Sequence, residues 1–450
     1  MDTKTRNRPK RQKNDNKRAE TPVRHEDNIL EFVQNNDHIF DDNNENLNTE
    51  IYDFDYAKEQ KEKELKKRRA HRQRVKEEQK KLRDAHTKKH AIFMIAGIIA
   101  VLLAFTVYSA SVKLMANNVS QVTQTASFEI EASEKSVAAS YNGGIIVSDR
   151  GKIILYDDHA REVLSQDSVS GMPIIKTAGN SAAVAYMSTK NAYIVNDGKI
   201  ITITAPEIIK GISVSQNGVC AVVCEEEGYR GQVVVYDADG NDIYRWHSAN
   251  DYITDVSVSP DGKNMVVATL EITDEKASAE AVFFDFRQNE AYATFTFEDN
   301  VCSNVKHLSK SRIAMVCDDK TYILSKSGKL AGEVDYKGMK PTTFDTDSDG
   351  NMVICFKHDD SILSQCDVVV FNRNGKEKGR YTANSAVSAV SINKSKVLAV
   401  PERRIVLVSE SGKEIYNGEI NKDVKQAFLL DDLTSAVVIS GTTAQYIELK

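Results

Sequence analysis

The chain has 450 residues, enough for roughly two or three domains, and its formal net charge of −6 is unevenly distributed. Residues 1–90 carry 24 Lys and Arg against 19 Asp and Glu, which leaves 35 basic and 46 acidic residues in the remainder. Such asymmetry indicates parts that work in different surroundings. The sequence contains no Gly-x-Ser-x-Gly nucleophile motif, phosphate-binding loop or dinucleotide fingerprint, so the enzyme classes built on these motifs are excluded.

The first 90 residues divide into a polar tail and a charged helix. Residues 1–55 combine low hydrophobicity with high charge, which predicts a disordered tail. Residues 56–90 lack Gly and Pro and are rich in Lys, Glu, Arg, Gln and Ala, which favours a solvated helix. We expect its basic end to attract anionic lipid head groups. No nucleic-acid partner is expected, because no recognition fold accompanies the basic residues.

An uncharged segment near residue 100 carries the strongest local signal in the chain. Residues 91–108 read AIFMIAGIIAVLLAFTVY, eighteen without a charge, and a helix needs about 20 apolar residues to cross a bilayer. We predict a transmembrane helix over residues 91–115, with the lipid bilayer as its partner. Lys and Arg crowd its N-terminal flank, so the positive-inside rule predicts a cytoplasmic tail and an extracytoplasmic C-terminal domain at the plasma membrane. Residues 116–126 are interpreted as a linker.

From about residue 127 onward, short Val, Ile and Ala runs alternate with Asp-Gly, Asn-Gly and Ser-Gly turns, which is typical of many short antiparallel strands. The unit is clearest in residues 253–297, where ITDVSVS, NMVVATL, AVFFDF and EAYATFTF are separated by turns or loops. Similar units begin near residues 134, 171, 209, 252, 302, 340, 386 and 423. Four strands in each repeat of about 40–45 residues are typical of a β-propeller.

The predicted fold class is therefore all-β, an eight-bladed β-propeller over residues 127–450. Seven blades are the alternative count, and an array of β-sandwiches is the alternative architecture. The last unit lacks a fourth strand, and we expect residues 127–130 to supply it from the other end of the domain. Closing the ring in this way removes long exposed sheet edges.

The recurring order of strand, turn and apolar strand resembles the propeller repeats of TolB-like and quinoprotein-like domains. The turn Ser259-Pro260-Asp261-Gly262 is the one full match, so the resemblance is to an architecture. The whole layout also resembles an uncharacterised bacterial family with a cytoplasmic tail, one transmembrane helix and an outer propeller, catalogued as a domain of unknown function. This resemblance implies a topology and no activity. A quinoprotein cofactor is not expected, because the chain has one Trp and no adjacent Cys pair.

Two acidic turns raise the question of calcium binding. In the first, alternate carboxylates precede a glycine, as in calcium loops, but Phe356 stands where an EF-hand needs Glu. We interpret it as an ordinary acidic turn; its residues are Asp345, Asp347, Asp349, Gly350 and Asn351. The second turn falls between a third and a fourth strand, where Asp and Gly are favoured for backbone reasons. Its residues are Asp237, Asp239, Gly240 and Asp242. No metal site is assigned.

The histidines and cysteines of the outer domain form no recognisable site. Four His residues fall in separate units without paired zinc spacing, namely His159, His247, His307 and His358. Six Cys residues fit no metal motif, and we interpret the set as small buried hydrophobes: Cys220, Cys224, Cys302, Cys317, Cys355 and Cys366. Cys220 and Cys224 lie along one strand, too far apart to bridge, whereas Cys355 and Cys366 are able to face each other across a hairpin.

We therefore expect a non-enzymatic binding or scaffold module tethered at the cell envelope, with no catalytic, cofactor or metal residues assigned. Its expected partner is an unknown extracytoplasmic protein or polymer. Residues 271–280 and 357–365 are the expected contact loops, because both are hydrophilic and neither completes a sheet. The alternatives are an extracytoplasmic enzyme acting on envelope polymers, which clustered carboxylates with raised pKa values would favour, and a structural envelope-assembly factor.

Overall fold

The computed structural model describes residues 121–131, 136–273, 276–358 and 364–450, together with scattered helical positions between 63 and 106. Those positions are 63, 67, 74, 94, 98, 99, 101–104 and 106. Among the described residues, no helix is both long enough and apolar enough to cross a membrane. Most of residues 91–115, the tail of residues 1–55 and most of residues 56–90 lie outside the described part. The transmembrane helix, its orientation and the charged helix therefore stay predictions.

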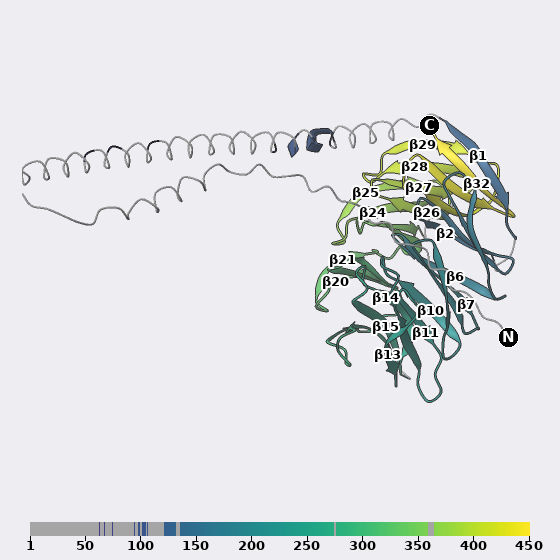
Figure 1. Ribbon diagram of the computed structural model, residues 1–450. Coiled ribbons are helices and arrows are strands. Elements are labelled where there is room, and N and C mark those ends of the chain that lie inside the picture. Colours follow the sequence, from purple (N-terminus) through teal and green to yellow (C-terminus); the bar gives the residue numbers. More distant parts are fainter. Residues whose placement is uncertain are drawn as a thin grey trace, which may run out of the picture. The chain divides into compact units, whose positions relative to one another are not determined.

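From residue 121 onward, the chain forms eight antiparallel sheets of four strands each, arranged as the blades of a ring (Figure 1). This confirms the predicted eight-bladed β-propeller, and the alternatives of seven blades and of a sandwich array are wrong. The first strands begin at residues 137, 172, 209, 252, 302, 340, 387 and 424, close to every predicted unit start. The turn signals located the units because each blade is built from local hairpins.

Blades 1 to 7 each use four consecutive strands, and the first strand of a blade lies nearest the ring axis. The first strands contact one another in turn around much of the ring, as β2 does with β6 and with β30. Blades 1 and 2 comprise β2 (Val137–Tyr141), β3 (Gly144–Asp149), β4 (Lys152–Tyr156), β5 (Glu162–Asp167), β6 (Met172–Ala178), β7 (Ser181–Met187), β8 (Asn191–Asn196) and β9 (Lys199–Thr204). Blades 3 and 4 comprise β10 (Ile209–Val214), β11 (Cys220–Cys224), β12 (Gly231–Tyr236), β13 (Asp242–Ser248), β14 (Tyr252–Val258), β15 (Asn264–Ile272), β16 (Ala277–Asp285) and β17 (Ala293–Phe297).

The second half of the ring repeats this order and ends in the closing blade. Blades 5 and 6 comprise β18 (Cys302–Ser309), β19 (Arg312–Cys317), β20 (Lys320–Ser325), β21 (Leu330–Asp335), β22 (Lys340–Thr346), β23 (Met352–Lys357), β24 (Cys366–Phe371) and β25 (Glu377–Ala383). Blades 7 and 8 comprise β26 (Val387–Asn393), β27 (Lys396–Pro401), β28 (Arg404–Ser409), β29 (Glu414–Glu419), β30 (Val424–Leu429), β31 (Ser435–Ser440), β32 (Thr443–Leu449) and, as the outermost strand, β1 (Val122–Glu129).

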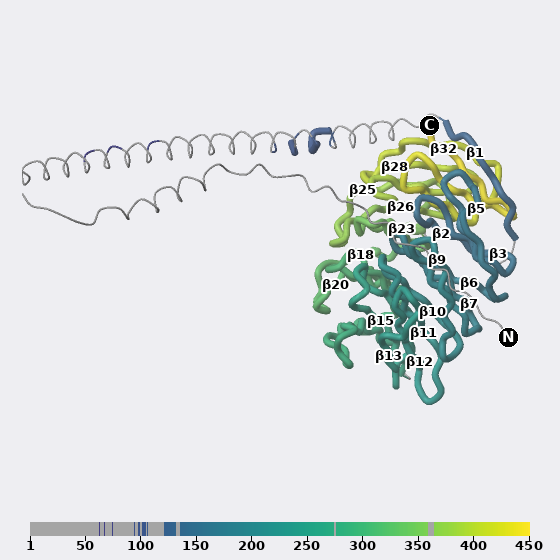
Figure 2. The backbone as a smooth tube through the Cα atoms, in the orientation of Figure 1, coloured from purple at the N-terminus to yellow at the C-terminus, as the bar shows by residue number. Residues whose placement is uncertain are grey.

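The ring is closed by the strand from the opposite end of the domain. β1 pairs antiparallel with β32 along its whole length, and Figure 2 shows the blue start of the domain beside its yellow end. Backbone hydrogen bonds between Gln121 and Lys450, at 2.7 and 2.8 Å, extend the ladder. The expected closure is confirmed. The closing strand begins at Val122, so the later part of the predicted linker 116–126 belongs to the propeller rather than preceding it.

Eight apolar clusters hold neighbouring blades together, one at each junction. The alternation of side chains along the central strands explains this arrangement. In β11, Cys220 and Val222 pack toward blade 2, whereas Ala221 and Val223 pack toward blade 4. Because both faces of these strands are buried, their sequences are continuous apolar runs. The propeller is a ring of sheets packed side by side.

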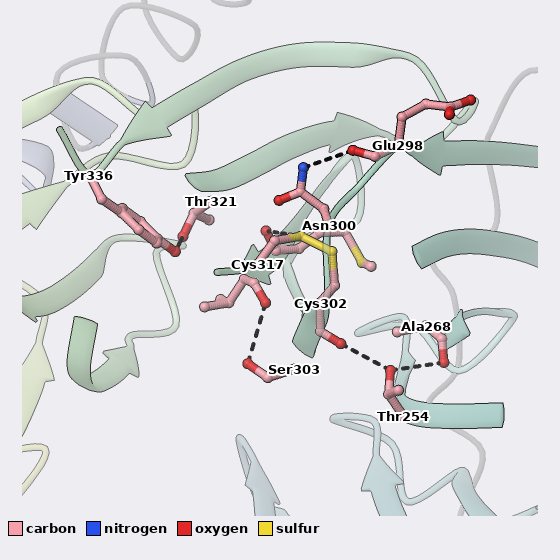
Figure 3. The surroundings of a disulfide bond; sticks show 11 residues. Thr254, Ala268, Glu298, Asn300, Cys302, Ser303, Cys317, Thr321 and Tyr336 are labelled. Atoms are coloured by element: carbon pink, nitrogen blue, oxygen red, sulfur yellow. Dashed lines mark hydrogen bonds between the residues drawn. A yellow bond between two sulfur atoms is a disulfide. The ribbon is translucent and has the colours of Figure 1, made fainter. Parts of the chain in front are cut away.

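One disulfide corrects the interpretation of the six cysteines as a set of small buried hydrophobes. Cys302 and Cys317 stand directly opposite each other on β18 and β19 and are bonded (Figure 3). Their neighbour Thr254 donates a hydrogen bond from its hydroxyl to the carbonyl oxygen of Cys302 at 3.1 Å. The other four cysteines are buried and free. Cys355 and Cys366 are not directly opposite each other, because Cys366 pairs with Lys357, two residues away from Cys355.

Candidate functional site

One face of the ring gathers the long loops. Because neighbouring strands are antiparallel, the loops from second to third strands lie on the same face as the loops between blades. We call this the linker face; in blades 3 and 4 it includes residues 225–230, 249–251, 273, 276 and 298–301. The described residues of both predicted contact loops lie there. The segment 271–280 is largely a hairpin extension of β15 and β16, whereas residues 274–275 and 359–363 lie outside the described part.

A cluster of two tyrosines, an arginine and a histidine occupies the linker face between blades 3 and 4. Tyr229 and Tyr252 are 48% and 45% exposed. Arg230 lies over the Tyr252 ring, 4.8 Å from its centroid, and donates a hydrogen bond to its hydroxyl oxygen at 2.8 Å. The Tyr229 ring centre lies 5.3 Å from that of His247, which pairs with Glu226. We call this the tyrosine–arginine cluster.

Further apolar side chains are exposed on the same face. Met172 begins β6, Ile272 ends β15, and Val301 precedes β18, so blades 2, 4 and 5 each contribute one. Their exposed fractions are 54%, 63% and 39%. Aromatic residues, Met and Arg are enriched in protein–protein interfaces. The linker face of blades 2 to 5 therefore has the composition of a contact surface.

Four charged side chains on first strands act on one another electrostatically at the ring centre. Lys176 stands on β6, Asp255 on β14, Lys306 on β18 and Asp345 on β22. All four are half-buried, so solvent still reaches them. Burial raises the pKa of Asp345 to about 6 and also raises that of Asp255, although Lys176 opposes the latter shift. Burial, together with the nearby Lys176 ammonium group, lowers the pKa of Lys306. We call these the ring-centre charges.

Both ring-centre carboxylates are bound to the backbone of the next blade. One Asp255 oxygen accepts a hydrogen bond from the Val305 amide at 2.9 Å, and one Asp345 oxygen accepts from the Ile392 amide at 2.9 Å. Serines do the same elsewhere: Ser213 accepts from Val258, Ser257 from His307 and Ser391 from Leu429. A side-chain acceptor on the first strand of one blade thus hydrogen-bonds to a backbone amide on the first strand of the next blade.

The first acidic turn does not bring its carboxylates together. Asp345 points to the ring centre, whereas Asp347 accepts hydrogen bonds from the backbone amides of Asp349 and Asn351, as turn residues do. In the second turn, Asp237 accepts from the amides of Asp239 and Asn241 in the same way. The arrangement favours the interpretation of both segments as ordinary turns.

The four histidines lie in blades 1, 3, 5 and 6 and do not meet. His159 forms, with Asp157 and Asp158, the one cluster of potential metal ligands within the described residues. Asp157 there accepts hydrogen bonds from the amides of His159 and Arg161, which gives it a role in the turn. His307 lies at the ring centre, where burial lowers its pKa to about 3, so its ring is neutral. Its Nδ1 atom is hydrogen-bonded to the Ser257 hydroxyl at 2.9 Å.

A polar network lies at the base of the loop 358–365. The Asp367 side chain is only 7% exposed. Its carboxylate accepts a hydrogen bond from Thr382 at 2.6 Å and is paired with Arg380 and with His358, the latter at 3.1 Å. Burial opposes its ionisation, but these hydrogen bonds hold its pKa below the usual value. Beside it, a hydrogen bond from the Cys355 thiol lowers the pKa of Cys366 to about 7. The network anchors both ends of the loop.

Comparisons with known proteins identify a family and a fold. A family described as a family of unknown function (DUF5711) matches residues 116–449. No curated protein matches the chain. The C-terminal WD40 domain of Sif2 is 8% identical, with a TM-score of 0.51, covering 74% of this chain and 99% of that one. BamB from Moraxella catarrhalis is 11% identical, with a TM-score of 0.46, covering 74% and 98%. At such identities the likeness to the WD40 domain shows the fold alone.

Proposed function

The chain belongs to the DUF5711 family of unknown function, and from this premise we propose that it is a membrane-tethered, extracytoplasmic propeller that binds a protein partner without catalysis. The tyrosine–arginine cluster carries this proposal. Tyr and Arg dominate the binding energy of protein interfaces, because they combine a large apolar contact area with hydrogen-bonding groups.

The cluster is built to keep its shape before a partner arrives. Arg230 is held by the ring and hydroxyl of Tyr252, and His247 is held between Tyr229 and Glu226. Side chains already ordered in the free protein lose little conformational entropy on binding. The surrounding Met172, Ile272 and Val301 extend the apolar contact over neighbouring blades.

The alternative function is an extracytoplasmic enzyme, which carboxylates with raised pKa values would favour. Asp255 and Asp345 both have raised pKa values. However, an oxygen of each accepts a backbone hydrogen bond from the next blade. A general acid or base needs one oxygen free to exchange a proton with substrate, and the second oxygen of Asp345 is engaged as well, because it accepts from the Thr346 amide at 2.8 Å. The arrangement therefore supports a structural role for Asp345, and the binding function is preferred.

Site-directed photocrosslinking in cells that produce the full chain tests the proposal. A photoreactive residue at position 252 is expected to give one discrete adduct. The same residue at position 243, on the opposite face where Ile243 is 43% exposed, should give none. Arg230→Ala should weaken the adduct at position 252. Equal labelling from both positions, or no discrete adduct from position 252, would contradict a specific partner on the linker face.

A further inference from the structure

A cavity of about 180 Å³ lies between the outer strands of blades 7 and 8. It is bordered by β28 and β29 of blade 7 and by β32 and β1 of blade 8 (Figure 1). Ile405 and Ile447 are 2% and 4% exposed, so they form its floor, and Val122 and Ile420 extend the apolar part. The polar lining comes from Gln124, Tyr416, Glu419 and Gln445.

The cavity arises because blade 7 has a glycine where other blades place an aromatic side chain. In blades 3, 4 and 6, the fourth strand packs Trp246, Phe295 and Tyr381 against the junction with the next blade. Gly418 stands at the corresponding position of β29. The hydroxyl of Tyr416 lies where a Cβ of Gly418 would be, so the missing side chain leaves room for a polar group and an open space beside it.

Two glutamines at the cavity leave one donor and one acceptor free. The Gln445 side-chain amide donates a hydrogen bond to the Gln124 carbonyl oxygen at 3.1 Å. Within the part of the chain that the structure describes, neither side chain makes another hydrogen bond. The Gln124 amide nitrogen and the Gln445 carbonyl oxygen are therefore available, and exchanging the ends of both amides leaves the same pair of groups. Gln445 is only 8% exposed, so its oxygen is a buried acceptor in need of a donor.

A short acyl chain attached through an amide is the complement of these groups. A secondary amide has one N–H donor and one carbonyl acceptor, which match the free oxygen of Gln445 and the free nitrogen of Gln124. The methyl group of an acetyl chain would lose its contact with water against Ile405 and Ile447, which is favourable for an apolar group. The cavity thus fits an acetamido group better than a purely apolar or a charged one.

The rim of the cavity supplies groups that bind hydroxyls. The Tyr416 hydroxyl has no hydrogen-bond partner among the described residues. Glu419 is exposed and uses one carboxylate oxygen on Arg404 at 3.4 Å, which leaves the other oxygen able to accept. A phenol hydroxyl both donates and accepts, so the two side chains suit a ring that carries several hydroxyl groups. They favour a sugar over an acylated peptide, whose backbone has no hydroxyl groups.

We propose that the cavity between blades 7 and 8 binds an acetamido sugar, with the acetyl group inside and the sugar hydroxyls at the rim. The cavity volume equals that of roughly six water molecules in the liquid, at about 30 Å³ each. This is room for the acetamido group and part of the ring that carries it. The site is separate from the tyrosine–arginine cluster of blades 3 and 4, so this inference does not rest on the proposed protein-binding function.

N-Acetylglucosamine is the probe for the first test, added to the full-length protein in detergent. Saturation-transfer NMR should show saturable binding, with the largest transfer to the acetyl methyl protons because they contact the apolar floor. Glucose lacks the acetamido group and should bind at least about fivefold more weakly, since two hydrogen bonds are lost. N-Acetylalanine has the acyl group without the sugar. Its binding as tightly as N-acetylglucosamine would overturn the assignment to a sugar.

Variants of the glutamine pair test the cavity itself. Gln124→Ala removes the free donor from an exposed position, and Gln445→Leu removes the free acceptor with little change in volume. Each should weaken N-acetylglucosamine binding at least about fivefold. Gln288→Ala, in an exposed turn of blade 4, is the matched control, with unchanged binding expected. The adduct at position 252 should be unchanged in Gln124→Ala, so the two proposals fail separately. Absence of saturable binding by the wild-type protein, or equal binding by Gln124→Ala and the control, would overturn the proposal.

Discussion

Single residues in this propeller act mainly by connecting one blade to the next. Gly350 shows this in the turn between β22 and β23. Its φ of +81° is a conformation that favours glycine, and an added Cβ would lie 2.4 Å from the carbonyl oxygen of Leu308 in blade 5. The glycine of the acidic turn is therefore needed for packing between blades, which supports the interpretation of this turn as structural.

Gly350→Ala should accordingly destabilise the protein more than the same change in an open turn. Gly143 is the matched control: its φ is +79°, but nothing lies within 4 Å of an added Cβ. Gly143→Ala should cost about 1 kcal/mol from backbone strain alone. Gly350→Ala should cost about 2 kcal/mol more, because backbone of blade 5 must move. Urea unfolding of both variants measures the difference, and equal losses would show that the close approach is unimportant.

Asp345 predicts a pH dependence of stability. Its carboxyl group titrates near 3.8 when unfolded and at about 6 when folded. The folded state thus binds this proton more tightly, so the stability contributed by the protonated group is present at low pH and is lost as the pH rises from about 4 to about 6.

Asp345→Asn removes this titration and keeps an oxygen for the Ile392 amide. The free energy of unfolding of the wild type, relative to this variant, should fall by up to about 3 kcal/mol between pH 4 and pH 7. Denaturant unfolding at several pH values gives the difference. Asp349→Asn, in an exposed part of the next turn, controls for the loss of one negative charge. A difference between wild type and Asp345→Asn that is constant with pH would contradict this prediction.

At the scale of elements, β1 has an unusual position. It belongs to blade 8, although it lies more than 300 residues before its partner β32 in the chain. Its outer face is exposed, and its inward side chains Val122, Ala126 and Phe128 are half-buried. Phe128 stacks on Tyr156 of blade 1, with ring centroids 4.0 Å apart. The strand therefore joins the last blade to the first.

Deletion of residues 122–129 from the full chain should lower the free energy of unfolding by at least about 3 kcal/mol. It removes the apolar contacts of Val122 and Phe128 and leaves β32 as an unpaired edge, which also promotes self-association. Thermal unfolding and size-exclusion chromatography measure these effects. Ser127→Ala, on the exposed face of the same strand, should change stability by no more than about 0.5 kcal/mol. A deletion variant as stable as this control would refute ring closure by β1.

At the scale of the whole molecule, eight apolar junctions form one closed circle, so that loops and side chains on the linker face are held at fixed spacing. A rigid ring of this kind is suited to present residues from several blades to one partner. The predicted transmembrane helix would hold it at the membrane through the strand that closes it.

Protease treatment of intact cells tests the predicted topology. The propeller should be removed or cleaved, whereas residues 1–90 should be protected, because the positive-inside rule places them in the cytoplasm. Antibodies against each part follow the fragments, and permeabilised cells provide the control in which both parts are cleaved. Protection of the propeller together with digestion of the tail would reverse the orientation.

The blade count, the strand positions and the closing strand were predictable from the sequence alone, because hairpin turns and alternating apolar runs are local features repeated along the chain. The tyrosine–arginine cluster and the ring-centre charges were not, and the Cys302–Cys317 bond depended on the irregular register that places the two residues opposite each other on β18 and β19 of one blade. Arg230 and Tyr252 meet only because blades 3 and 4 are adjacent, and the charge of Lys176 acts on Lys306 only because the ring is closed. Contacts between separate repeats depend on how blades are placed around the axis, which no single repeat encodes, so the tertiary structure decided them.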